Sequence, residues 1–160
     1  MTLLYTDSLF LKHDTGAHVE TAERLRSITT RLEAAGLTKK CQSASFQPLE
    51  EAEVRRLHDP QQVVQVKQLC EHGGGRIDAD TVVSRDSFKV GLGAAGACCS
   101  AVDAVLGGQD ATALCLVRPP GHHATPFRSM GFCLFNNVAL AAQRARERHK
   151  LQRILIVDWD

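Results

Sequence analysis

The chain has 160 residues, of which 44% are hydrophobic and 23% charged, so it has room for one ordinary globular core. Its formal net charge of +1 at pH 7 gives no electrostatic reason to expect nucleic acid or an anionic membrane surface as a partner. No signal peptide is recognisable, and no uncharged apolar stretch is long enough to cross a bilayer. These features predict a cytoplasmic protein whose six cysteines are reduced and mostly buried.

The first half of the chain starts with a strand and continues with helices. Residues 3–5 form a short apolar run that predicts a strand, and residues 21–35 carry apolar side chains at helical spacing. A helix start is predicted at 47–51, and Pro60 is suited to open the next helix. The three consecutive glycines at 73–75 predict a loop.

The second half alternates between helices and strands. The longest helical pattern runs over 86–106, and an Ala-rich pattern over 136–149 predicts a second helix. Residues 113–117 and 154–157 are continuously apolar, which is typical of buried parallel strands. This alternation predicts an α/β fold in which a parallel sheet has helices on both faces, giving three layers.

A stiff, histidine-bearing turn follows the predicted strand 113–117. The sequence RPPGHHA occupies 118–124, and its prolines and glycine turn the chain away from the strand. His122 and His123 are thereby held at the carboxyl end of that strand, where two imidazoles can act as acid and base near neutral pH. A histidine pair alone also fits an exposed polar loop, but its rigid presentation by Pro-Pro-Gly beside a buried strand favours a functional site.

Two carboxylates follow the predicted strand 154–157. Asp158 and Asp160 are two residues apart, so on a strand they would point to the same side. A carboxylate pair at the end of an apolar run favours a cation, a histidine partner or both. Alternatively, one aspartate caps a following helix. Histidines and carboxylates that converge at neighbouring strand ends are the groups from which zinc hydrolases are built.

Three segments closely resemble the histone deacetylase family: RPPGHHA at 118–124, MGFCLFNNVA at 130–139 and IVDWD at 156–160. The resemblance covers nearly the whole chain and is closest to the bacterial and class II-like branch, with acetoin-utilisation proteins and acetylpolyamine amidohydrolases. Residues 13–25 resemble the family's N-terminal segment less closely, because the family usually has prolines where this chain has Val19 and Ala22. The implied fold is an incomplete domain of the arginase/deacetylase type.

The resemblance implies a role for each residue of the two clusters. His122 and His123 would be the tandem acid/base pair, and Asp158 would orient His122. Asp160 would be a zinc ligand. The implied cofactor is a zinc ion (Zn2+), and the family pattern also allows a structural potassium ion (K+) bound near Asp158 and Asp160.

The resemblance also implies a substrate site. Phe132 and Gly131 would line the narrow channel for an acylated stem, and Asp80, in the sequence DADT at 78–81, would grip the substrate backbone. The implied reaction is hydrolysis of an N-acetyl amide in acetylated lysine or in an acetylated polyamine. Oligomerisation and the choice between these substrates stay open.

In the family, the next zinc-binding histidine lies two residues beyond the position of Asp160. The resemblance therefore implies that residues 1–160 are the N-terminal part of a single deacetylase domain, cut after the first zinc-ligand aspartate. We expect the 160-residue polypeptide alone to bind zinc weakly and to lack deacetylase activity. A catalytically incompetent fragment or scaffold of the same family is the main alternative. A different metallohydrolase of arginase-like architecture is disfavoured by the histidine motif.

Overall fold

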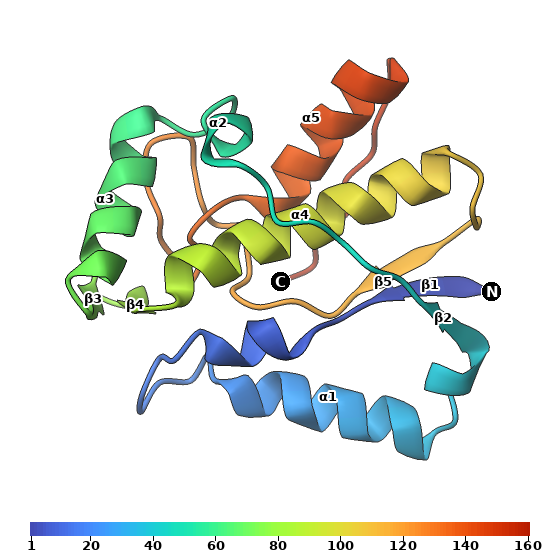
Figure 1. Cartoon of the computed structure of the whole chain (residues 1–160), viewed down its shortest axis with the longest axis horizontal. Coiled ribbons are helices and arrows are strands. Elements are labelled where there is room, and N and C mark those ends of the chain that lie inside the picture. Colours follow the sequence, from blue (N-terminus) through green and yellow to red (C-terminus); the bar gives the residue numbers. More distant parts are fainter.

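The longest helix, α4 (Ser87–Leu106), lies at the centre of the fold, and the computed structural model describes all 160 residues around it (Figure 1). One side of α4 packs against a parallel sheet and the other against α5 (Asn137–His149). On length and composition alone α4 is apolar enough to cross a membrane, and its burial between the sheet and α5 accounts for the same composition. The predicted helix over 86–106 is confirmed to within one residue.

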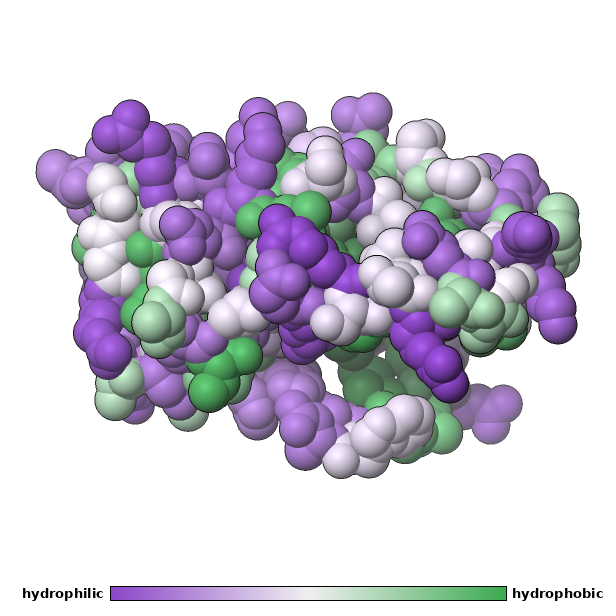
Figure 2. Space-filling model, turned by 90° about the horizontal axis from the view of Figure 1, so that it is seen from below, coloured by the Kyte–Doolittle hydropathy of each residue, from purple (hydrophilic) through white to green (hydrophobic).

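The sheet has three parallel strands in the order β2-β1-β5. β1 (Thr2–Tyr5) is the middle strand, between β2 (Cys41–Ser43) and β5 (Ala113–Cys115). In Figure 1, α4 lies above the strands and α1 (Ala22–Ala34) lies below them. The prediction of three layers with helices on both faces of a parallel sheet is confirmed. The face on the α1 side is mainly hydrophilic, with separate hydrophobic patches (Figure 2).

The core consists of two clusters of buried side chains, one on each side of α4. The sheet-side cluster is Leu3, Tyr5, Phe10, Leu25, Val90, Ala94, Ala97, Ala101 and Ala104. The second cluster includes Ala95 and Cys99 of α4 with Leu134, Phe135 and Leu140. The small residues of α4 allow close packing: a Cβ at Gly96 would lie 2.1 Å from the carbonyl oxygen of Gln47, so the chain before α2 crosses directly over the helix.

Short helices lead from the sheet to the remaining elements. The 3-10 helices η1 (Ser8–Lys12) and η2 (Thr38–Lys40) flank α1 in the sequence. The helix α2 (Glu51–Val54) begins at the end of the predicted segment 47–51, and α3 (Pro60–Glu71) opens at the predicted proline. Asp59 caps α3 by accepting a hydrogen bond from the backbone N–H of Gln61 at 2.7 Å.

The predicted loop at 73–75 is wrong, because part of it forms a strand. β3 (Gly74–Arg76) pairs antiparallel with β4 (Val82–Ser84). A Cβ at Gly74 would lie 2.4 Å from the carbonyl oxygen of Val83, so the absence of a side chain is what lets the two backbones approach. Glycine runs indicate loops on average, and here one of them serves a close strand contact.

The predicted buried strand at 154–157 is also wrong. These residues pair with no strand, and Leu155 and Val157 are 85% and 65% exposed. With α4, α5 and β5, residues 154–156 line an apolar cavity of about 560 Å³. An apolar run shows a tendency to be buried, but a strand also needs a partner backbone to accept and donate its hydrogen bonds.

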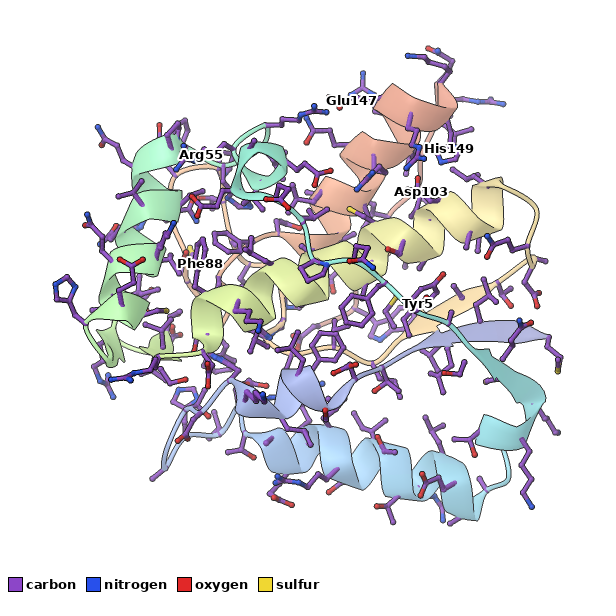
Figure 3. The ribbon with its side chains drawn as sticks, in the orientation of Figure 1. Tyr5, Arg55, Phe88, Asp103, Glu147 and His149 are labelled. Carbon is purple, nitrogen blue, oxygen red and sulfur yellow. The ribbon has the colours of Figure 1, made fainter.

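Ion pairs join α4 to α5 near the carboxyl ends of both helices. Asp103 of α4 lies 2.7 Å from Arg148 Nη1 and 2.7 Å from His149 Nε2 (Figure 3). Asp103 also lies 3.5 Å from Arg144 Nη1. This network fixes the direction in which α5 leaves the segment that carries the histidine pair.

Candidate active site

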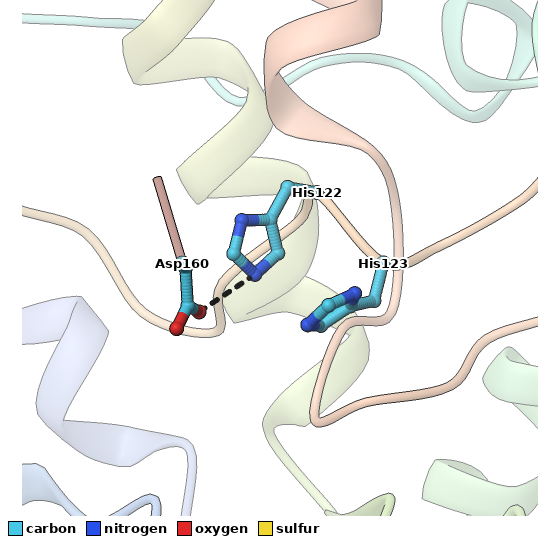
Figure 4. A group of neighbouring side chains, drawn as sticks. All are labelled: His122, His123 and Asp160. Carbon is cyan, nitrogen blue, oxygen red and sulfur yellow. Dashed lines mark ion pairs between the residues drawn. The ribbon is translucent and has the colours of Figure 1, made fainter. Parts of the chain in front are cut away.

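The two histidines lie on a long connection between β5 and α5, which we call the histidine loop (residues 118–136). The rings of His122 and His123 have centroids 4.2 Å apart and are tilted by 59° (Figure 4). His122 is about a quarter exposed and His123 is exposed. Gly121 packs against the start of α5, where a Cβ would lie 2.5 Å from the backbone nitrogen of Asn137. The predicted pair is therefore held at the surface by a loop whose base is buried.

Both predicted carboxylates lie beside the ring of His122. Asp158 Oδ2 is 2.9 Å from Nδ1, and Asp160 Oδ2 is 3.2 Å from Nε2. The side chains converge although residues 154–157 form no strand. The Asp158 carboxylate favours a proton on Nδ1, and the Asp160 carboxylate faces the other ring nitrogen, Nε2.

A metal ion could be held by three of these residues. The ligand atoms of His122, His123 and Asp160 all lie within 4.8 Å of one another. Imidazole nitrogen and carboxylate oxygen are donors that zinc accepts, so the donor set fits this ion in type. Asp158, predicted to help bind a structural potassium ion, is not one of these three residues and lies against the opposite nitrogen of His122.

The three predicted substrate residues lie together next to His123. Met130 and Cys133 exchange two backbone hydrogen bonds, of 3.1 and 3.0 Å, which close a turn with Gly131 and Phe132 at its tip. The backbone N–H of Gly131 donates to Asp80 Oδ1 at 3.2 Å. A Cβ at Gly131 would lie 2.6 Å from Cδ2 of His123, so a glycine is required for the turn to pack on that ring.

A buried ion pair supports the first residue of the histidine loop. Arg118 is fully buried and donates from Nε and Nη2 to the two carboxylate oxygens of Glu20, both at 2.7 Å. Its Nη1 donates to the carbonyl oxygen of Phe10 at 3.1 Å. This bidentate geometry is the strongest form of a charged hydrogen bond between side chains. It ties the start of the loop to the N-terminal segment.

A buried histidine supports the rest of the loop. His58 accepts a hydrogen bond at Nε2 from the backbone N–H of Asn136, 2.9 Å, so its proton is on Nδ1, which donates to the carbonyl oxygen of Thr125 at 3.0 Å. Burial lowers the pKa of His58, against the opposing effect of its hydrogen bonds, and so favours this neutral form. The side chain of Asn136 in turn donates to the carbonyl oxygens of Ala124, at 2.9 Å, and His122, at 3.4 Å.

Cys133, which lies in the turn next to the site, is unsuited to nucleophilic catalysis. Burial raises the pKa of Cys133 to about 11, so it is a thiol at neutral pH. Burial also raises the pKa of Cys99 to about 11. All six cysteines are free, and Cys70, Cys99 and Cys133 are buried, whereas the other three are only partly buried. Any hydrolysis at this site would therefore use water rather than a thiolate.

Comparison with known proteins identifies the family. The model of the histone deacetylase domain matches residues 18–160. The chain belongs to the histone deacetylase family. It is 36% identical over 143 residues to a histone deacetylase-like amidohydrolase of Pseudomonas aeruginosa, covering 89% of this chain and 38% of that protein. It is 39% identical over 161 residues to the polyamine deacetylase HDAC10 of Homo sapiens, covering 97% of this chain and 24% of that protein.

The fold of the family is also confirmed. The crystal structure of the HDA15 HD domain superposes with a TM-score of 0.86 at 29% identity, covering 92% of this chain and 43% of that one. The chain therefore spans less than half of each of these three relatives. The Pseudomonas aeruginosa relative is named an amidohydrolase and the Homo sapiens relative a deacetylase, so the family includes hydrolases.

Several residues that shape this candidate site carried no signal as single positions in the sequence. His58 and Glu20 look like ordinary polar residues near helix starts, and Arg118 looks like part of the proline-rich motif. Their partners are 67 to 108 residues away along the chain. Only burial in the folded protein distinguishes them from surface side chains.

Proposed function

We propose that the protein carrying this chain is a zinc-dependent deacetylase that hydrolyses N-acetyl amides in acetylated lysine or acetylated polyamines. The observation that carries the proposal is the arrangement around His122: a carboxylate lies 2.9 Å from Nδ1, and the tilted ring of a second histidine has its centroid 4.2 Å away. A carboxylate in this position supports a general-base role for His122, because it can set the tautomer of the ring.

Each residue then has a chemical task. Asp160 would hold the zinc ion, which would acidify a bound water and polarise the acetyl oxygen. With Asp160 on the zinc ion rather than on His122, Nε2 of His122 would be free to accept a proton while Asp158 holds the Nδ1 proton. His123 lies on the substrate side, against the Gly131 turn, and is placed to return a proton to the leaving amine. A potassium ion near Asp158 and Asp160 would be structural.

The substrate class follows from the groups around the turn. Phe132 is partly exposed at the tip of the turn and presents an aromatic face to an aliphatic stem. The Asp80 carboxylate is exposed beside it and accepts hydrogen bonds from N–H groups. The aliphatic stem of acetylated lysine or of an acetylated polyamine fits the aromatic face, and peptide amides or polyamine ammonium groups can supply N–H donors to Asp80. The printed names of the relatives, an amidohydrolase and a polyamine deacetylase, support the same class.

The test is acetate release by the full-length protein that carries this chain, with zinc, from an acetyl-lysine peptide and from an N-acetylpolyamine. His122→Ala and His123→Ala are each expected to lower kcat by about 100-fold or more, since general acid–base catalysis contributes about 10²- to 10⁴-fold. His72→Ala is the matched control, because His72 is exposed at the end of α3. Zinc binding without any acetate release would instead support a scaffold.

The 160-residue polypeptide by itself is expected to bind zinc weakly and to release no acetate. Catalytic zinc sites usually have three protein ligands, and the family motif supplies Asp160 as one. Isothermal titration with zinc, alongside the acetate assay, measures both properties. If the 160 residues bound zinc tightly and released acetate, the expectation would be contradicted. His122 and His123 would then be the additional zinc ligands, as their distances permit.

A further inference from the structure

Two segments far apart in the sequence meet at one buried hydroxyl beside the site. The segment between β3 and β4 contains Asp80 and Thr81, and Thr81 is fully buried. Its Oγ1 donates to Asp80 Oδ1 at 3.0 Å and accepts from the backbone N–H of Phe132 at 3.1 Å. This one hydroxyl therefore hydrogen-bonds to two residues of the substrate site, Asp80 and Phe132, which are 52 positions apart in the sequence.

The backbone at Phe132 needs such support. Its φ of 67° and that of Gly131, 57°, are the positive values of a type I′ turn, whose central positions favour glycine and asparagine. For a residue with a Cβ this left-handed conformation is disfavoured, because the Cβ crowds the following carbonyl oxygen. A hydrogen bond to the N–H of Phe132 offsets part of that cost and directs the aromatic ring.

The position of the Thr81 hydroxyl is fixed, because both the backbone N–H and the carbonyl oxygen of Thr81 are hydrogen-bonded. Its N–H donates to Asp78 Oδ1 at 2.8 Å, and its carbonyl oxygen accepts from the N–H of Ile77, also at 2.8 Å. Desolvation raises the pKa of Asp78, but hydrogen bonds from Asp80 and Thr81 outweigh it and lower the pKa overall, so Asp78 stays a charged acceptor. The carboxylate of Asp80 keeps Oδ2 free of hydrogen bonds within the chain.

We propose that the Thr81 hydroxyl is a positioning group that sets the distance between the Phe132 ring and the free oxygen of Asp80. A fixed distance favours a substrate that has both an aliphatic acylated stem and an amide N–H at the matching separation, as a peptide has. An acetylated polyamine lacks the peptide amide, and its own N–H groups lie along the flexible stem, so the fixed distance matters less for it. Thr81 thus determines selectivity between the two substrate classes, an inference that rests on the proposed deacetylase function.

The decisive comparison is Thr81→Val against Thr81→Ser. Valine has the shape of threonine without the hydroxyl, whereas serine keeps both hydrogen bonds. In the full-length protein, Thr81→Val is expected to raise KM for an acetyl-lysine peptide about tenfold, the effect of one buried hydrogen bond, with kcat changed less than twofold. KM for an N-acetylpolyamine should change less than threefold, and Thr81→Ser should resemble the parent for both. Equal changes in KM for both substrates would overturn the proposed role of Thr81 in selectivity.

Amide hydrogen exchange tests the positioning without relying on catalysis. The N–H of Phe132 is expected to exchange about tenfold faster or more in Thr81→Val than in Thr81→Ser, while amides in α4 are unchanged. Unchanged exchange at Phe132 would refute the positioning role, even in a protein that proves to have no deacetylase activity. If the valine variant does not fold, Thr81→Cys, a weaker donor and acceptor, should give a smaller acceleration in the same direction, and no acceleration would count against the proposal.

Discussion

The histidine loop and the C-terminal segment (residues 151–160) face each other across 3.2 Å between His122 and Asp160, but the fold holds them differently. The loop is tied to the interior at Arg118 and at Asn136 through fully paired side chains. The C-terminal segment pairs with no strand, and its Asp160 is 76% exposed.

This difference teaches which part of the site is organised in advance. Buried hydrogen bonds to Glu20 and His58 determine where the imidazoles lie, independently of the carboxylates. The carboxylates keep their places mainly by contacts with His122, which water and salt weaken. Four measurements can break or sharpen this contrast, and they are taken from the largest expected effect to the smallest.

The largest effect is expected from Glu20→Gln, which removes the charge that compensates Arg118. Breaking a buried ion pair on one side costs about 3–5 kcal/mol of unfolding free energy. Urea unfolding followed by circular dichroism measures this. The control is Glu23→Gln in the same segment, since the Glu23–Arg26 pair is exposed and its loss should cost less than about 1 kcal/mol. Equal losses of unfolding free energy in both variants would contradict the expected difference between the buried and the exposed ion pair.

Acidification is expected to destabilise the base of the loop through His13. Burial lowers the pKa of His13 from 6.5 to about 4, so in the folded protein it is neutral and its approach to Glu20, 3.8 Å, is not a charge pair. The unfolded chain takes up a proton below pH 6.5 and the folded one only below about 4. The contribution of His13 to the free energy of unfolding is therefore fully present above pH 6.5, and the free energy falls by about 3 kcal/mol as the pH drops to 4.

The measurement for His13 is urea unfolding at several pH values between 7 and 4. His13→Gln cannot take up the proton, so its free energy of unfolding should depend less on pH over this window than that of the parent. The hydrogen bond from Nδ1 to Ser87, 2.7 Å, is lost or altered equally at all pH values and does not affect the slope. Parallel slopes for parent and variant would contradict the assigned pKa.

A smaller effect is expected from His58. His58→Ala leaves the partly buried N–H of Asn136 without its acceptor, and this costs about 1–3 kcal/mol of unfolding free energy. His58→Gln places a carbonyl oxygen near the position of Nε2 and should restore part of the loss. Both stability and amide exchange at Asn136 report on the contact. If the glutamine variant behaved like alanine at Asn136, the Nε2 contact would not be what anchors the loop.

The smallest effect on stability is expected from Asp158→Asn. Asp158 is about half exposed, so its pairing with His122 should contribute less than about 1 kcal/mol. Urea unfolding at low and high salt measures this contribution, which should shrink further as salt is added. A loss comparable to that of Glu20→Gln would mean that the C-terminal segment is as firmly held as the loop.

Much of the fold was predictable from local patterns. Periodic apolar residues and caps located the four longest helices, and apolar runs located β1 and β5. The errors arose where structure depends on a partner: Gly74 forms a strand because Val83 lies against it, and residues 154–157 form none because no backbone pairs with them. Hydrophobicity along the chain does not record which backbone groups find partners.

The sequence by itself determined the family and the chemical groups of the site, because RPPGHHA and IVDWD place imidazoles and carboxylates after apolar segments. The tertiary structure alone decided which polar residues hold those groups in place. Glu20, His58 and Thr81 act because they are buried and bonded to residues 51 to 98 positions away. Burial makes an unpaired polar group costly, and that cost depends on surroundings that only folding creates.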